Sequence, residues 1–288
     1  MMYLAAFMLA GVLTIPVVSN DINEALIEGI KHHDEMLRSY TVATEEQIIY
    51  YKDPLRDKFL PKPLRRTFWG RFSSEGHLKS VIRKNIEIFP PKGERITVER
   101  KMIFDGEKVI EQIIYSYSHR ITGREYHIFP PSAYNPFKSE DFDPKYWLGY
   151  YGTPLSKLLT EDVVSDLSFQ EEFVQGERCF RIKAKLADRE LEFLINTERG
   201  YRPQEVIIRK AGGRWTRIKI HLVSDGHGIW YPAEVELKDY DGPFDKGRLL
   251  LEKHIKFTRF IGNTEIPRRH FIVVPDEFDS VYDHRRFK

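Results

Sequence analysis

Polar and apolar residues alternate with a period of two along much of the second half of this chain. Phe180, Ile182 and Ala184 are interleaved with Arg181 and Lys183. The same alternation recurs over 191–195, 217–222 and 234–238. Successive side chains of a strand point to opposite faces of a sheet, so this pattern predicts antiparallel strands with one buried face and one wet face.

The first half is also rich in runs with β character. They cover 46–52, 64–73, 79–89, 95–104, 109–119 and 124–129. Asp105-Gly106 separates two of these runs, and Asp-Gly between such runs is a strong hairpin signal. The whole chain then holds about eleven strands, a number that suits a large curved sheet, a barrel or a sandwich.

One helix is predicted before the first strand. Apolar residues recur at helical spacing from 22 to 37, and Asn20 and Asp21 can cap the first turn. The helix should run from 22 to 38 and end near Ser39, where the residues that follow turn β-like. The stripe consists of Ile22, Leu26, Ile30, His33 and Leu37.

The first nineteen residues carry no charged side chain, and residues 2–18 are almost continuously apolar. This run is shorter than the roughly 20 residues that span a bilayer core. It predicts a signal peptide over 1–19, cleaved between Ser19 and Asn20, and a periplasmic or secreted protein. A positively charged start is missing, so an uncleaved membrane anchor stays open as the alternative.

Residues 20–288 are predicted to form a single β domain with an insertion over 130–160. The chain has 45 basic and 43 acidic residues, a net charge of +2, so no lopsided field favours nucleic acid. Cys179 is the one cysteine, which excludes an intramolecular disulfide. We expect Cys179 to pack as a small apolar residue at the start of a strand.

Two places could carry chemistry. Glu28, His32 and Glu35 would share a helix face and could hold a metal, but the pattern favours a solvated polar face. His227, between two glycines, could act as an acid or base, or could simply lie in a turn. No nucleophile elbow, P-loop or dinucleotide glycine pattern occurs. The sequence therefore predicts no enzyme and no cofactor.

The insertion is unusually rich in proline and aromatic residues. Aromatic side chains on a stiff loop can floor an apolar pocket, stack on sugar rings, or plug the end of a β core. We expect five of them to line or gate a ligand cavity: Tyr134, Phe137, Trp147, Tyr150 and Tyr151.

The order of several short segments also resembles a known family. These are residues 104–107, 176–180, 195–203, 228–232, 263–266 and 271–275, after a signal and one amphipathic helix. In this order the chain resembles the LolA/LolB-like superfamily of outer-membrane lipoprotein-sorting proteins, in its longer secreted bacterial form. The resemblance implies a half-barrel, a curved antiparallel sheet whose concave apolar face is covered by the N-terminal helix and the insertion.

The resemblance further implies a non-enzymatic periplasmic carrier that holds a lipid, an acyl chain or a lipoprotein in that concave face, in association with the envelope. Two alternatives stay open. One is a secreted carbohydrate- or envelope-binding module without a lipid cavity. The other is a hydrolase whose site includes His227 and nearby carboxylates.

Overall fold

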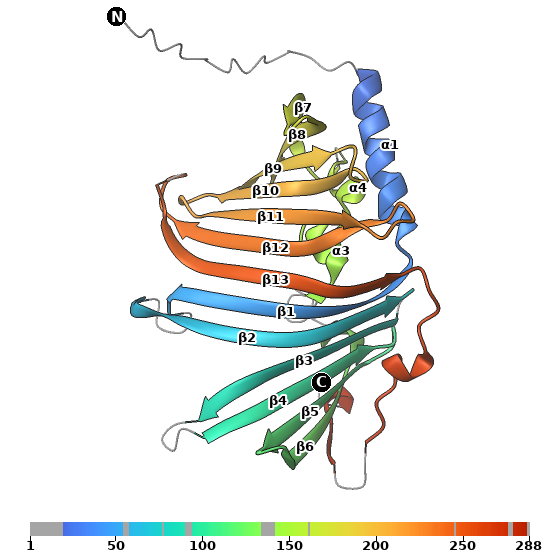
Figure 1. The fold of residues 1–288 in the computed structure, drawn as a ribbon, viewed down its shortest axis with the longest axis vertical. Helices are drawn as coiled ribbons and strands as arrows, with labels where there is room; N and C mark the ends of the chain where they lie inside the picture. Colours follow the sequence, from blue (N-terminus) through green and yellow to red (C-terminus); the bar gives the residue numbers. More distant parts are fainter. Residues whose placement is uncertain are drawn as a thin grey trace, which may run out of the picture.

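The computed structural model describes residues 20–53, 58–76, 78–89, 94–133, 142–160, 162–244, 246–275 and 279–286. These residues form one sheet of fourteen strands that is curved and does not close (Figure 1). This confirms the predicted class, a mainly β protein with a large curved antiparallel sheet and an N-terminal helix. Residues 1–19, Tyr134 and Phe137 lie outside the described residues, so the expectations about them stay predictions.

Six strands precede the central segment, which contains two short helices, and eight follow it. The first six are β1 (Ser39–Lys52), β2 (Phe59–Glu75), β3 (Leu78–Phe89), β4 (Glu94–Phe104), β5 (Val109–Tyr117) and β6 (Arg120–Phe129). The others are β7 (Ser165–Val174), β8 (Glu177–Leu186), β9 (Arg189–Asn196), β10 (Arg202–Lys210), β11 (Trp215–Ser224), β12 (Trp230–Asp241), β13 (Arg248–Gly262) and β14 (Ser280–Asp283). The helical elements are α1 (Asn20–Met36), η1 (Pro131–Ala133), α3 (Pro144–Trp147), α4 (Leu155–Leu158), η3 (Arg268–Phe271) and η4 (His284–Arg286).

Two meanders, β1–β6 and β7–β13, are joined edge to edge. β1 pairs antiparallel with β13, from Tyr40 opposite Gly262 to Tyr50 opposite Leu251. The strand order is therefore β14-β6-β5-β4-β3-β2-β1-β13-β12-β11-β10-β9-β8-β7. Strand β14 returns to the edge of β6, where it lies parallel. The two central strands thus come from positions far apart in the sequence.

The predicted contrast between the two faces is confirmed in the second meander. Val206, Ile208 and Ile218 are buried on one face of β10 and β11, within the main core. Glu205 and Lys219 alternate with them and face the other side. Cys179 is fully buried on β8, as expected.

Helix α1 lies at the ends of strands β9 to β12 (Figure 1). Leu26 and Ile30 are buried on its inner side, as the apolar stripe predicts. Asn263 at the end of β13 closes the helix. Its Oδ1 accepts the Arg38 N–H at 2.9 Å, and its Nδ2 donates to the Met36 carbonyl at 2.8 Å.

The chain after β13 crosses the face of β2–β6 that lies opposite the main core. Ile103 and Tyr126 form a small core there with Val273. The Tyr126 hydroxyl donates to the Val273 carbonyl at 3.0 Å. The first meander is therefore covered on this face by the C-terminal segment.

The predicted number of strands, about eleven, is too low. Strand β14 is four residues long, and β10 contains Pro203 near its start. In β7 the adjacent Glu171 and Glu172 break the alternation. In each case the strand is held by pairing with its neighbour rather than by its own pattern.

Within the described part of the chain, no helix has the length and apolar character needed to cross a membrane.

Candidate functional site

The described part of the aromatic insertion, residues 142–160, lies against the buried sheet face, and we call it the cover. Trp147 ends α3, and Tyr150 and Tyr151 lie in the turn that leads to α4. The turn is closed by the Tyr150 N–H, which donates to the Thr153 carbonyl at 2.9 Å. Seen in Figure 1, α3 and α4 lie behind the strands of the second meander.

The three described aromatics of the predicted site pack as core side chains. Trp147 is 3% exposed and Tyr150 is 8% exposed. The space that they and Tyr151 share with Val206 and Ile208 is a cavity of about 10 Å³. This is room for at most one water molecule. In this conformation the side chains of the cover fill the place where an apolar ligand was expected.

The protein also acts on the phenol groups of Tyr150 and Tyr151. Arg189 donates to the Tyr150 hydroxyl at 2.6 Å. Burial, and then the neighbouring Tyr150 and Asp239, raise the pKa of Tyr151 to about 12. The phenol of Tyr151 therefore stays protonated at physiological pH.

A buried ion pair ties the cover, α1 and the sheet together. Arg202, on β10, is 4% exposed and donates to the Asp34 carboxylate and to the His33 carbonyl, both on α1. The other oxygen of Asp34 accepts the Ser156 N–H of α4 at 3.1 Å. Burial is the main cause that lowers the pKa of Arg202, and Asp34 opposes it. We call this group the Arg202 link.

A second buried charge lies at the start of α3. The Asp143 carboxylate accepts the Tyr40 hydroxyl at 2.5 Å and the Lys145 N–H at 2.9 Å. Burial raises the pKa of Asp143 and lowers the pKa of Lys145. Lys145 and Arg202 also line a cavity of about 50 Å³ beside the Arg202 link. The junction between cover and sheet is therefore polar at this end and apolar under the aromatics.

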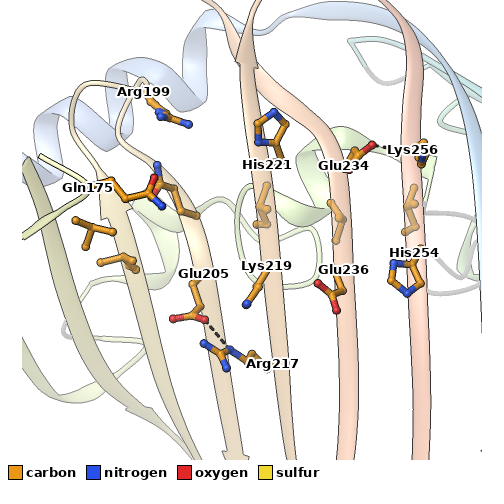
Figure 2. Close-up of a pocket in the computed structure, with 16 residues that line it drawn as sticks. Gln175, Arg199, Glu205, Arg217, Lys219, His221, Glu234, Glu236, His254 and Lys256 are labelled. Carbon is orange, nitrogen blue, oxygen red and sulfur yellow. Dashed lines mark hydrogen bonds and ion pairs between the residues drawn. The ribbon is translucent and has the colours of Figure 1, made fainter. Parts of the chain in front are cut away.

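The wet face of β10–β13 carries a wide, open groove of about 500 Å³ (Figure 2). Its charged side chains largely neutralise one another. Arg217 donates to Glu205 at 2.6 Å, and Lys256 lies 3.6 Å from Glu234. Exposed pairs of this kind contribute at most about 1 kcal/mol each. The groove has the character of the solvated sheet face that the alternation predicts.

One set of possible metal ligands occurs among the described residues, and the sequence analysis missed it. Glu236, Glu252 and His254 offer ligand atoms within 4.8 Å of one another. Lys238 already contacts both carboxylates, at 3.2 Å from Glu252. A metal ion would have to displace this ammonium group, so the arrangement is that of an ion-pair network.

Of the two places weighed for chemistry, the α1 residues form no metal-ligand cluster within the described residues, and His227 lies in a turn. Glu28 is exposed and lies 3.8 Å from Lys31, within the solvated face of α1. The Asp225 carboxylate accepts the N–H groups of His227 and Ile229, at 2.8 and 3.1 Å. Asp225 thus organises an ordinary turn, and His227 is exposed on it.

The comparisons with known proteins add little. No family model and no curated protein matches this chain. Among solved structures, an uncharacterized conserved protein from Thermus thermophilus is similar at 9% identity, with a TM-score of 0.36. The match covers 91% of this chain and 99% of that chain. A likeness at that TM-score carries no argument about the function of this protein.

Proposed function

We propose that this protein is a non-enzymatic, carrier-like protein of the bacterial periplasm that holds a lipid or acyl chain against the apolar face of its sheet. The observation that supports this proposal is the nature of the layer over that face. It consists of α1 and the cover, two segments outside the sheet that meet at the Arg202 link. A layer outside the hydrogen-bonded ladder can move without breaking a strand.

The proposal requires the cover to move, because the cavity beneath it holds only about 10 Å³. Burying an acyl chain contributes roughly 0.8 kcal/mol per CH₂ group. A chain of ordinary length could therefore replace the contacts that Trp147 and Tyr150 make with the sheet. The buried Arg202–Asp34 pair weakens the closed state relative to an apolar contact, because desolvating both charges is costly.

Binding of a fluorescent fatty acid tests the proposal. Trp147→Ala and Tyr151→Ala should each change the affinity at least threefold, about 0.7 kcal/mol, since both side chains border the space the ligand would take. Trp69→Ala is the matched control, because Trp69 is 43% exposed on β2. If the wild type binds no fatty acid, and neither Trp147→Ala nor Tyr151→Ala does, the carrier proposal is wrong.

The periplasmic location rests on residues 1–19, outside the described structure. Mass spectrometry of protein purified from its native envelope would report the mature start and any lipid that copurifies. A start at Asn20 would support export with cleavage, and a start at Met1 would support the membrane anchor.

The carbohydrate-binding alternative needs an exposed aromatic platform, and Trp147 and Tyr150 are buried.

A further inference from the structure

A second cavity lies on the opposite side of the sheet from the cover, between η3 and the outer face of β2–β4. Its volume is about 250 Å³. Three neighbouring strands and the C-terminal segment supply its walls, so segments some two hundred residues apart in sequence meet there. The lining residues are Arg71, Ser73, Ser80, Ile82, Lys101, Arg269 and His270.

The charged side chains in this lining are all basic. Arg71 lies opposite Ile82, which lies opposite Lys101, in one row across β2, β3 and β4. Since adjacent strands are about 4.8 Å apart, the two cations rise from the sheet about 10 Å from each other. Arg269, from η3, adds a third cation on the facing wall.

The two guanidinium groups of this cavity have no carboxylate partner in the described part of the chain. Among the described residues, neither Arg71 nor Arg269 makes an ion pair or a side-chain hydrogen bond with a carboxylate. Burial lowers the pKa of Lys101, and Glu99, two residues before it on β4, opposes this shift but does not line the cavity. The wet-face groove differs, because Arg217 and Lys256 there are paired with Glu205 and Glu234.

Two serine hydroxyl groups complete the floor. Ser73 and Ser80 lie directly opposite each other on β2 and β3, and both are almost fully buried. The Ser73 hydroxyl is hydrogen-bonded to the Thr41 hydroxyl and lies 3.4 Å from the Nδ1 atom of His270. Lys101 donates to the Ile272 carbonyl at 2.9 Å, which holds the C-terminal segment over the cavity.

The positive field also shows in the ionisation of the lining. Burial lowers the pKa of His270, and Arg71, Arg269 and Lys101 lower it further. Concentrated positive charge in a recess of the surface is costly unless an anion occupies it.

We propose that this cavity is a binding site for a phosphate group, carried by a small phosphate ester or by a phospholipid headgroup. A guanidinium group can form two parallel hydrogen bonds to the oxygens of a phosphate. Two guanidinium groups, one lysine and two hydroxyl groups together suit a tetrahedral oxyanion. The volume is below the 300 Å³ or so of a typical small-molecule pocket, so it suits a headgroup rather than an acyl chain. The inference does not depend on the carrier proposal, because the cavity lies on the other face of the sheet.

Thermal shift and calorimetry with inorganic phosphate and glycerol 3-phosphate test this site, with acetate at the same ionic strength as the control anion. We expect both phosphates to bind and acetate to bind at least tenfold more weakly. Arg71→Gln and Arg269→Gln should each weaken phosphate binding about tenfold or more. The matched control is Arg65→Gln, an exposed arginine on the same strand, and it should change the affinity less than twofold.

Vesicle cosedimentation identifies the source of the phosphate. If the ligand is a headgroup, the wild type should bind vesicles of phosphatidylcholine with phosphatidic acid more strongly than vesicles of phosphatidylcholine alone. The Arg269→Gln variant should not bind the vesicles that contain phosphatidic acid. Binding of glycerol 3-phosphate without vesicle binding would assign a soluble ester. The proposal is overturned if about 10 mM of either phosphate leaves the protein unaffected and vesicle binding is the same for all variants. It is also overturned if Arg65→Gln weakens binding as much as Arg71→Gln.

Arg269 lies in an exposed turn, so its variant keeps the test informative if Arg71→Gln disturbs β2. Circular dichroism of each variant checks the fold before binding is measured. Failure of fatty-acid binding would leave this result unchanged, and failure here would leave the carrier proposal unchanged.

Discussion

At the scale of single residues, buried charges do most to distinguish this protein from a plain β sheet. Arg202 reaches from β10 to Asp34 of α1, and Asp143 accepts the Tyr40 hydroxyl beneath the cover. Removing each of these charged groups from water costs free energy, and only an ion-pair or hydrogen-bond partner offsets that cost. The contacts of these residues therefore decide how firmly α1 and the cover are attached.

Replacing Arg202 by methionine should lower the free energy of unfolding by about 3–5 kcal/mol, because Asp34 would be left buried without its cation. Urea unfolding measures this. Arg178→Met is the control, since Arg178 is exposed and its loss should cost at most about 1 kcal/mol. The double variant Arg202→Met with Asp34→Leu should recover part of the loss. A single-variant loss below about 1 kcal/mol would contradict the role given to this pair.

Glu192 should make stability depend on pH. Burial tends to raise the pKa of this carboxyl, but hydrogen bonds from Arg181 at 2.6 Å and Arg209 at 3.1 Å outweigh it and hold the pKa below its usual value. The stabilisation is complete above the unfolded pKa of about 4.3 and is lost as the pH falls through the lower folded value. Glu192→Gln should cost about 1.5–3 kcal/mol at pH 7 and progressively less below about pH 4.

The exposed Glu190, two residues away on the same strand, supplies the control for that pH series. Glu190→Gln should change the free energy of unfolding, measured in urea, by less than about 0.5 kcal/mol at neutral and at acid pH. If Glu192→Gln lowers the free energy of unfolding equally at acid and neutral pH, packing rather than ionisation causes the loss.

At the scale of elements, the cover consists of two short helices, α3 and α4, joined by a compact turn. The Tyr150–Thr153 pairing brings the chain back on itself so closely that a Cβ at Gly149 would lie 2.1 Å from the Thr153 carbonyl oxygen. Helices of four residues have no stability of their own. The cover therefore depends on this turn and on the aromatic side chains that it presents to the sheet.

Gly149→Ala should open the turn and lower the free energy of unfolding by about 1–3 kcal/mol. Gly123→Ala is the control, because a Cβ there meets only the Tyr115 ring at an ordinary 3.5 Å. Equilibrium unfolding measures the loss, and limited proteolysis locates it. Cleavage of the variant within 142–160, with the sheet intact, is expected; equal protease resistance of the two variants would contradict it.

At the scale of the whole molecule, the join between β1 and β13 makes one sheet of two meanders. Each meander by itself would expose the edge of a long strand, and the join pairs both edges. The fourteen described strands thus belong to one sheet, and the single domain over 20–288 stays a prediction. Because β1 lies between β2 and β13, its loss would affect both halves.

Gln47→Pro should disrupt both meanders, because proline in a central strand removes a donor and clashes with the ladder, at a cost of about 3 kcal/mol or more. Ser168→Pro in the edge strand β7 is the control, with a smaller, local effect. Hydrogen exchange measures protection strand by strand. Protection lost in β1–β6 but fully kept in β10–β12 would show that the halves fold independently.

The sequence by itself determined the class of the protein, because alternation and turn residues act locally. The burial of Ile182 and Ile218, the hairpin at Asp105 and the stripe of α1 follow from spacing alone. Only the tertiary structure decided which residues meet across the sheet. One cavity is lined by Arg71, Lys101 and Arg269, and Arg202 forms an ion pair with Asp34. Both arrangements depend on contacts between distant segments, which no local sequence pattern encodes. Likewise, Trp147 and Tyr150 could be picked out as important, but whether they enclose space or fill it depends on how closely the cover packs.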